Sequence, residues 1–268
     1  VMANVDLFDT LSFEPSEQLQ FTCSDPRLPT DDSNLVVKAA KLLARESGHA
    51  GGARIHLHKN IPAGGGMGGG SSDAACTLVG LSRMWNLNWS TERLQPLAAQ
   101  LGSDIAFFLY GSWCRCLGRG EVVERLPGSD KWPKIPVTLI LPPLHVATPS
   151  VYKALNASCT INEKSAMRSL TDVTRQLQCV LTTLHACGRI NDAGLRNDLT
   201  EAAVRVEPRL QPLQQLLQDK YAGQWLMSGS GAVHFVVGPT REEGLRLQAE
   251  MEKRIGPGIR VLTSTITP

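Results

Sequence analysis

The sequence has little net charge of either sign, no long apolar run and no ordered pattern of cysteines. Its 27 lysines and arginines nearly balance 25 aspartates and glutamates, and the net charge of +2 indicates neither a nucleic-acid partner nor a membrane surface. No apolar run approaches the ~20 residues that span a bilayer. The first residues, VMANVDLFDT, lack the basic segment that opens a signal peptide.

Seven cysteines are scattered along the chain, and Cys114 and Cys116 form the only close pair. This spacing gives neither a disulfide framework nor a zinc pattern, and it predicts free thiols in a reducing cytoplasm. The close pair alternates along a predicted strand, so we expect it to pack rather than react. His56 and His58 share one face of another strand, but without a third ligand in view we expect a solvated face rather than a metal pair.

What the chain does have is an ordinary globular composition, 42% apolar and 19% charged, over 268 residues, which suits one large domain or two. Alternating and helical apolar spacings predict strands and helices in turn, which favours an α/β or α+β fold. The predicted strands are 5–13, 53–61, 137–141, the segment after SGSG and 259–262, with a hairpin over 111–126. The predicted helices start at Ser33, Ser71, Ser90, Asp198 and Thr240. The strand at 137–141 is the expected entry into a second domain.

The segment IPAGGGMGGGSSDAA, residues 61–75, carries six glycines in the seven positions 64–70, between a predicted strand and a predicted helix. Without Cβ atoms the backbone can fold closely around oxygen atoms, and the following helix adds unpaired N–H groups and the positive end of its dipole. Ser71 and Ser72 add hydroxyls that could cap the helix, touch phosphate or help to hold magnesium. A flexible linker is disfavoured between a clean strand and a clean helix. The segment therefore predicts a phosphate site.

Three known phosphate loops do not fit this segment. A Walker A loop ends in Gly-Lys-Ser/Thr, whereas this one ends in Gly-Ser-Ser. Gly64, Gly66 and Gly69 satisfy the dinucleotide fingerprint nominally, but the acidic residue expected ~20 positions later would fall in a helix end and turn. The chain also lacks the HRD and DFG signatures of protein kinases.

At this point the sequence resembles the GHMP kinase superfamily, whose hallmark is a proline–glycine–serine–serine–alanine phosphate loop. The expanded form PAGGGMGGGSSDAA is similar to the branch that phosphorylates 4-diphosphocytidyl-2-C-methyl-D-erythritol. Further matching segments follow in the family's order: SNLVVKAAKLL, LGSDIAFFLYG, GRGE, TPSVYKAL, RNDLTEAA and SGSGAVHF. The likeness covers nearly the whole chain.

The resemblance implies an α+β (two-layer α/β) fold of two domains. The first, 1–132, would be an ATP-binding domain of the ribosomal-protein-S5-domain-2-like type, and the second, 133–268, a ferredoxin-like GHMP domain. It also implies ATP and Mg²⁺ as cofactors, and transfer of phosphate to the 2-hydroxyl of a cytidine-diphospho sugar alcohol in non-mevalonate isoprenoid synthesis. We expect this small molecule as the partner, with no nucleic acid and no membrane.

The resemblance also assigns residues. Asp104 matches the catalytic aspartate, and a carboxylate that accepts the proton of the attacking hydroxyl suits the chemistry; capping of the next helix is the simpler alternative. Asn34 would approach adenine or merely begin a helix. Tyr152 would stack on cytosine or fill the core, with Thr148 a nearby polar contact. Gly229 and Gly231 would line the substrate site or form a plain turn. The predicted ATP site comprises Pro62, Ala63, Gly64, Gly65, Gly66, Met67, Gly68, Gly69, Gly70, Ser71 and Ser72, with Ser72 the one candidate metal ligand.

One part of the family's pattern has no counterpart in this sequence. The family begins with a strand that bears a lysine near the reacting hydroxyl, followed by a tyrosine–histidine pair that binds cytidine, and VMANVDLFDT matches the portion just downstream. This absence favours a non-catalytic nucleotide-binding relative as one alternative. Homoserine or mevalonate kinase activity is another, because the fold alone does not reveal the substrate class. An NAD-dependent oxidoreductase would depend on the accidental glycine fingerprint alone.

Overall fold

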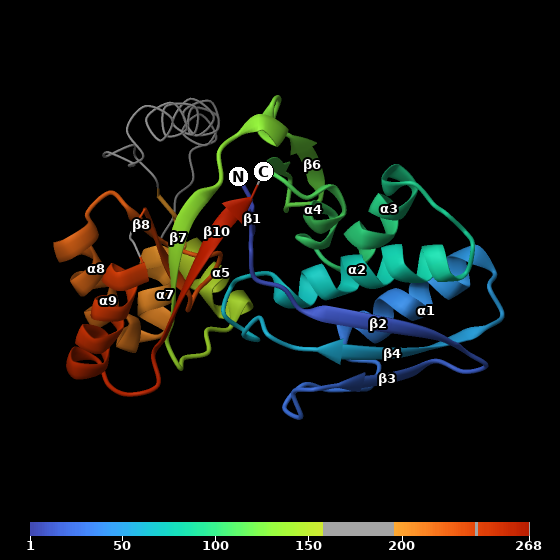
Figure 1. The fold of residues 1–268 in the computed structure, drawn as a ribbon, viewed down its shortest axis with the longest axis horizontal. Helices are drawn as coiled ribbons and strands as arrows, with labels where there is room; N and C mark the ends of the chain where they lie inside the picture. Colours follow the sequence, from blue (N-terminus) through green and yellow to red (C-terminus); the bar gives the residue numbers. More distant parts are fainter. Residues whose placement is uncertain (158–195, 239–240, 268) are drawn as a thin grey trace. The chain divides into compact units, whose positions relative to one another are not determined.

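The computed structural model describes residues 1–157, 196–238 and 241–267. The chain divides into two compact units (Figure 1). The first unit comprises Val1–Ala63 and Gly68–Lys131, and the second comprises Gly64–Met67 and Trp132–Thr267. Among the described residues, none of the helices combines the length and the apolar character needed to cross a bilayer.

The first unit is a sheet covered by helices on one face. The sheet consists of β2 (Thr10–Ser16), β3 (Gln20–Cys23) and β4 (Gly52–His58), with β4 between an antiparallel β2 and a parallel β3. The short strand β1 (Asn4–Val5) falls in the same unit but is not part of this sheet. Its helices are α1 (Leu35–Ser47), α2 (Gly69–Met84), α3 (Thr91–Leu101) and α4 (Ile105–Tyr110). A hairpin of β5 (Cys114–Leu117) and β6 (Val122–Arg125) and a 3₁₀ turn η1 (Ser129–Lys131) complete the unit.

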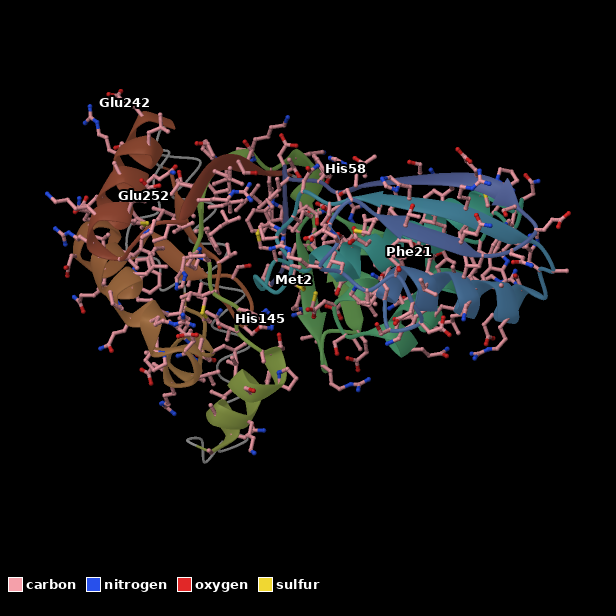
Figure 2. The ribbon with its side chains drawn as sticks, turned by 90° about the horizontal axis from the view of Figure 1, so that it is seen from below. Met2, Phe21, His58, His145, Glu242 and Glu252 are labelled. Atoms are coloured by element: carbon pink, nitrogen blue, oxygen red, sulfur yellow. The ribbon has the colours of Figure 1, made fainter. Side chains whose placement is uncertain are left out.

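The alternation in β4 explains how this unit builds its core. Ala53, Ile55 and Leu57 are buried in the core that α1 and α2 cover (Figure 1), while His56 and His58 are exposed. Figure 2 labels His58 on this strand. This half-buried pattern is what a sheet with one solvated face requires. Small residues let the helices pack closely on the sheet. At Gly80 of α2, for example, a Cβ would lie 2.6 Å from the ring of Phe13 in β2.

The second unit is an antiparallel sheet in the order β10–β7–β9–β8. Its strands are β7 (Ile135–Leu141), β8 (Trp225–Met227), β9 (His234–Val237) and β10 (Arg260–Thr267). Its helices are α5 (Thr148–Asn156), α7 (Thr200–Val206), α8 (Gln211–Tyr221) and α9 (Arg241–Arg254), with a 3₁₀ turn η2 at Pro208–Leu210. These elements confirm the predicted α+β character of the chain.

Two separate apolar clusters hold this unit together. Leu213 and Leu217 of α8 and Met251 of α9 pack with Ile140 and Val236 of the sheet. The opposite face of α9 carries exposed acidic side chains such as Glu242 and Glu252 (Figure 2). The second cluster joins Val151 of α5, Ala202 of α7 and Met227 of β8. Helix α5, which carries predicted site residues, is therefore anchored by its buried side.

Several predicted helix starts are corrected by the structure. Helix α1 is capped by Asn34, whose side chain accepts the Val36 N–H at 2.9 Å, while the predicted cap Ser33 donates to Asp31 instead. Helix α2 begins at Gly69 rather than Ser71, since glycines accept helical geometry when the following residues favour it. Ser90 stands at the cap position of α3 as predicted, although its side chain makes no capping bond.

In the second unit, the predicted cap Asp198 pairs with Arg196, and the side chain of Asn197 accepts the Leu199 N–H at 2.9 Å. Asn197 stands two residues before Leu199, the residue that precedes α7, and from there its side-chain oxygen reaches the Leu199 N–H. The predicted cap Thr240 lies outside the described residues.

Candidate active site

The middle of the glycine loop lies against the SGSG turn, Ser228–Gly231, within the second unit. The Ser228 hydroxyl donates to the Gly66 carbonyl at 2.9 Å, and the Val233 N–H donates to the Gly65 carbonyl at 3.1 Å. Both bonds use loop carbonyls, so the loop's N–H groups take no part in this contact. The structure thus brings together two segments that the sequence placed in one site.

Glycine is needed in this loop for reasons of packing as well as ligand access. Gly64 and Gly66 have φ of +72° and +74°, a region that side chains disfavour. A Cβ at Gly66 would lie 2.4 Å from the Ser228 carbonyl, and one at Gly64 would lie 2.2 Å from Nδ1 of His145. Glycine at these two positions therefore lets the loop pack closely against Ser228 and His145 of the second unit. The sequence did not indicate this packing role.

Thr148 joins the SGSG turn through its hydroxyl, which lies 2.7 Å from the Ser230 hydroxyl. Tyr152 follows one turn later on α5 and is 51% exposed. The alternative of a buried core tyrosine is therefore wrong, and the ring is available for stacking. The two predicted substrate residues share a helix and one of them contacts the turn.

Asn197 is a residue of this site that sequence reasoning did not single out. Its Nδ2 donates to the Met227 carbonyl at 2.8 Å and to the Gly229 carbonyl at 2.7 Å, which fixes the first glycine of the SGSG turn. Asn197 lies in the segment RNDLTEAA, which matches the family. Its hydrogen-bond partners are about 30 residues away in the sequence, so the neighbouring residues give no indication of this role. Ser228 and Ser230 were missed for the same reason.

The start of α2 is open to an anion. The residue before the helix is Gly68, with φ of +69°, and no side chain caps the first N–H groups. The Ser72 hydroxyl donates to the Gly69 carbonyl at 2.7 Å, so its lone pairs remain available as acceptors or metal ligands. An uncapped helix start of this kind binds phosphate through its N–H groups and dipole.

Asp104 stands immediately before α4, the helix that packs against the start of α2. A Cβ at Gly68 would lie 2.8 Å from the Phe108 ring, and Phe108 stands one turn after Asp104 on the same side of α4. Asp104 is exposed and makes no capping bond, so the alternative role as a helix cap is not supported. Partial desolvation raises the pKa of its carboxyl.

Gly120 of the GRGE segment keeps the approach to this carboxylate clear. A Cβ at Gly120 would lie 3.2 Å from Asp104 Oδ1 and 3.1 Å from the Ser103 carbonyl. The segment that the resemblance singled out thus lies beside the candidate base.

Asn34 has its amide largely occupied by the chain itself. It caps α1 and donates to the Pro29 carbonyl at 2.8 Å, which supports the simpler of its two predicted roles, a helix-start residue. Its neighbour Leu35 lies within ordinary contact, 3.7 Å, of a Cβ built on Gly70. The start of α1 therefore lies beside the start of α2.

The strand histidine His56 and the strand cysteine Cys114 make contacts typical of structural side chains. His56 pairs with Thr22, whose hydroxyl lies 2.8 Å from its Nδ1. Cys114 is buried and its thiol donates to the Gly111 carbonyl, and burial raises the pKa of this thiol, so it packs rather than reacts. The part of the chain that the structure describes contains no cluster of three or more His, Cys, Asp or Glu residues that could hold a metal ion.

A glycine loop that leads into an uncapped helix, with a carboxylate just before α4, a helix that packs against α2, suits phosphoryl transfer from a nucleotide. The family model for the GHMP kinases N terminal domain matches residues 34–112, which run from the cap of α1 past Asp104. The chain is accordingly a small-molecule kinase of the GHMP type.

Relatives define the family further. A 4-diphosphocytidyl-2-C-methyl-D-erythritol kinase of Chloroherpeton thalassium is 34% identical over 254 residues, 95% of this chain and 85% of that protein. One of Syntrophus aciditrophicus is 37% identical over 240 residues, 88% of this chain and 78% of that protein. The chain belongs to the 4-diphosphocytidyl-2-C-methyl-D-erythritol kinase family.

Solved structures agree with this placement. A crystal structure of 4-(cytidine 5'-diphospho)-2C-methyl-D-erythritol kinase superposes with a TM-score of 0.74 at 28% identity, covering 99% of this chain and 88% of that one. A homoserine kinase from Cytophaga hutchinsonii gives a TM-score of 0.75 at 20% identity, covering 98% and 88%. The second likeness shows the shared two-domain GHMP kinase fold.

Proposed function

We propose that this kinase transfers the γ-phosphoryl group of MgATP to the 2-hydroxyl of 4-diphosphocytidyl-2-C-methyl-D-erythritol, a step of non-mevalonate isoprenoid synthesis. The named relatives support the substrate. The observation that carries the chemistry is the uncapped start of α2 beside α4, the helix that follows Asp104, because it pairs a phosphate site with a carboxylate in one layer. The alternatives are a homoserine or mevalonate type of kinase and a non-catalytic nucleotide-binding relative.

In this proposal the glycine loop and the first turn of α2 bind the triphosphate. The residues are Pro62 to Gly70 with Ser71 and Ser72, and Asn34 lies at the adenine end. The N–H groups of the helix start would face the phosphate oxygens and stabilise the charge that develops during transfer. The uncapped helix start supports this assignment.

Asp104 is the proposed general base. An alcohol is a weak nucleophile, and a carboxylate that accepts its proton as the new P–O bond forms lowers the barrier. Desolvation raises the pKa of the Asp104 carboxyl, which makes the carboxylate a better proton acceptor. Its exposure leaves it accessible to a substrate hydroxyl.

Magnesium would arrive with the nucleotide. Kinase Mg²⁺ is held by phosphate oxygens, water and one or two protein oxygens, so a site with few protein ligands is expected. Ser72 is the protein ligand that we propose, since its hydroxyl donates to Gly69 and keeps its lone pairs. The ion would neutralise charge on the transferred phosphate.

The cytidyl substrate would be bound in the second unit. Tyr152 offers an exposed ring for cytosine. Gly229 and Gly231 belong to the SGSG turn, and Thr148 contacts that turn through the Ser230 hydroxyl. We also propose that the domains are residues 1–132 and 133–268, with the two compact units in support. The cytoplasmic location predicted from the cysteines stays a prediction.

The experiment is an ADP-release assay with ATP, Mg²⁺ and each candidate alcohol. We expect ADP with the cytidyl substrate and none with homoserine or mevalonate. The 268-residue chain and a form extended upstream in frame are assayed in parallel. ADP only with homoserine or mevalonate would refute the substrate, and nucleotide binding without turnover in either form would favour the non-catalytic relative.

A further inference from the structure

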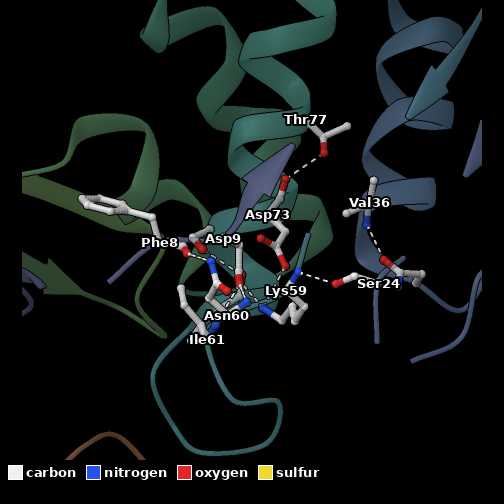
Figure 3. Close-up of polar contacts among 12 residues, drawn as sticks. Phe8, Asp9, Ser24, Val36, Lys59, Asn60, Ile61, Asp73 and Thr77 are labelled. Carbon is white, nitrogen blue, oxygen red and sulfur yellow. Dashed lines mark hydrogen bonds and ion pairs between the residues drawn. The ribbon is translucent and has the colours of Figure 1, made fainter. Parts of the chain in front are cut away.

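A buried cluster of three charged side chains lies beside the glycine loop (Figure 3). Lys59 Nζ forms an ion pair with Asp9 and another with Asp73, the second at 3.1 Å. The three side chains are only 6%, 3% and 5% exposed. Lys59, which precedes the glycine loop in the sequence, is thus paired twice inside the first unit.

The cluster connects the two ends of the loop. Lys59 stands just before the loop, after β4, and Asp73 lies in the second turn of α2, just after it. Asp9 also accepts the N–H groups of Asn60 at 2.6 Å and Ile61 at 2.8 Å with its other oxygen. Three consecutive residues at the loop's entrance are thus held by one carboxylate (Figure 3).

The two ends are in direct contact as well as charge-paired. A Cβ at Gly69, the first residue of α2, would lie 2.9 Å from Lys59 Nζ and 2.9 Å from Ile61 Cγ2. The entrance of the loop and the first turn of the helix are therefore packed together, with the ammonium group at their junction. We therefore expect a change in the cluster to shift one end of the loop relative to the other.

Buried ion pairs of this kind seldom add much stability. Desolvation of the charges offsets their attraction, and an apolar replacement of equal volume is often neutral. Their best-attested benefit is a fixed geometry, because each charged group accepts few arrangements of its partners. In this cluster the geometry that is fixed is the separation of the loop's ends.

We propose that Asp9, Lys59 and Asp73 are positioning residues that hold the two ends of the glycine loop together and thereby set the affinity of the loop for the phosphates of ATP. This inference depends on the proposed function only in taking ATP as the nucleotide. Lys59 acts through its two carboxylate partners, because its ammonium group pairs with them rather than with the triphosphate.

Asp73→Ala is the main test, with ATP binding measured by calorimetry in the absence of the alcohol substrate. The change detaches α2 from Lys59 while Lys59 keeps Asp9, so no buried charge is left without a partner. We expect the Kd for ATP to rise about tenfold and the KM of the cytidyl substrate to stay the same. Asp73→Asn, which retains an acceptor for Lys59, should restore most of the affinity.

A control separates positioning from general loss of stability. Ser129→Ala removes a buried hydroxyl that lies 3.1 Å from the Ser112 hydroxyl, outside the cluster and the loop. It should lower the melting temperature without changing the Kd for ATP. An equal rise of the Kd in this control would overturn the proposal.

Two further outcomes decide the matter. Unchanged ATP affinity in Asp73→Ala refutes the positioning role, and tighter binding refutes it too, because it would mean that the freed Lys59 contacts phosphate directly.

If Asp73→Ala does not fold, Asp9→Asn takes its place: it keeps the acceptor for Asn60 and Ile61, removes one charge, and should also weaken ATP binding. ATP binding without phosphate transfer would refute the proposed function alone, and a wild-type chain that binds no ATP would refute both.

Discussion

The ring of Phe108 lies directly against Gly68, so close that a Cβ at Gly68 would come within 2.8 Å of the ring. This contact joins α4, which begins after the candidate base Asp104, to the first turn of α2, the candidate phosphate site. Both helices belong to one unit, so the packing at Gly68 contributes to the relative position of the candidate base and the candidate phosphate site.

Gly68→Ala is therefore expected to impair catalysis as well as stability. The substitution meets both the strain of φ at +69° and the Phe108 ring, and it should destabilise the protein by about 2–5 kcal/mol, the sum of left-handed strain and overpacking. We expect kcat/KM to fall at least ~10-fold, because about 1.4 kcal/mol of misplaced transition-state contact is enough for this. Urea unfolding and steady-state kinetics measure the two effects.

Gly48→Ala is the matched control for this change. Gly48 has nearly the same φ, +67°, but a Cβ there would meet nothing within 4 Å. It should cost only the strain, about 1–2 kcal/mol, and leave kcat/KM unchanged. If both variants lose activity equally, the Phe108 contact has no catalytic importance.

Asp104→Asn should leave ATP affinity nearly intact and lower kcat at least ~100-fold, the usual scale for loss of a general base. The amide keeps the size of the side chain but cannot accept the proton of the hydroxyl. Calorimetry with ATP and single-turnover kinetics separate binding from chemistry. Unchanged turnover would remove Asp104 from the mechanism.

The pH dependence of stability should report the burial of Asp73. Burial raises the pKa of this carboxyl to about 7, against the opposing pull of Lys59, from 3.8 in the unfolded chain. The folded state then binds the proton more tightly, so this contribution is present below about pH 4 and is lost as the pH rises through 7. At its steepest the loss is about 1.4 kcal/mol of unfolding free energy for each pH unit.

The comparison that isolates this effect is between the wild type and Asp73→Asn, by urea unfolding from pH 4.5 to 8. The wild-type advantage should shrink as the pH rises and level off above 7. Burial also lowers the pKa of His234 to about 4, which makes both proteins more stable as the pH rises from 4 to 6.5. That opposite trend is common to both and cancels in the difference; a constant difference would contradict the shift at Asp73.

Much of this fold follows from local patterns in the sequence. The alternation of β4 and the glycine at the end of α1 predict their elements because each side chain acts on its immediate neighbours. The phosphate loop was evident for the same reason. The cap of α1 was placed one residue early because Ser33 and Asn34 are both good caps, and only the Asp31 carboxylate decides between them.

The contacts between distant segments could not be predicted in this way. Asp9 and Asp73 lie 50 and 14 residues from Lys59, respectively, and nothing in the local pattern of any of them indicates an ion pair. The same holds for Asn197, which bonds to Gly229 32 residues away. Charged and amide side chains find such partners only after the strands and helices have been assembled.

Asn197→Asp tests the importance of one of these distant contacts. The carboxylate can still accept the Leu199 N–H, so the start of α7 is kept, but it cannot donate to the Met227 and Gly229 carbonyls, and it places a negative charge beside them. Two lost hydrogen bonds and this repulsion should loosen the SGSG turn and raise the KM of the cytidyl substrate at least ~10-fold, with about 1.4 kcal/mol sufficient. Asn197→Ser, which retains a small polar side chain without the charge, should have a weaker effect. An unchanged KM in Asn197→Asp would show that the turn does not bind the substrate.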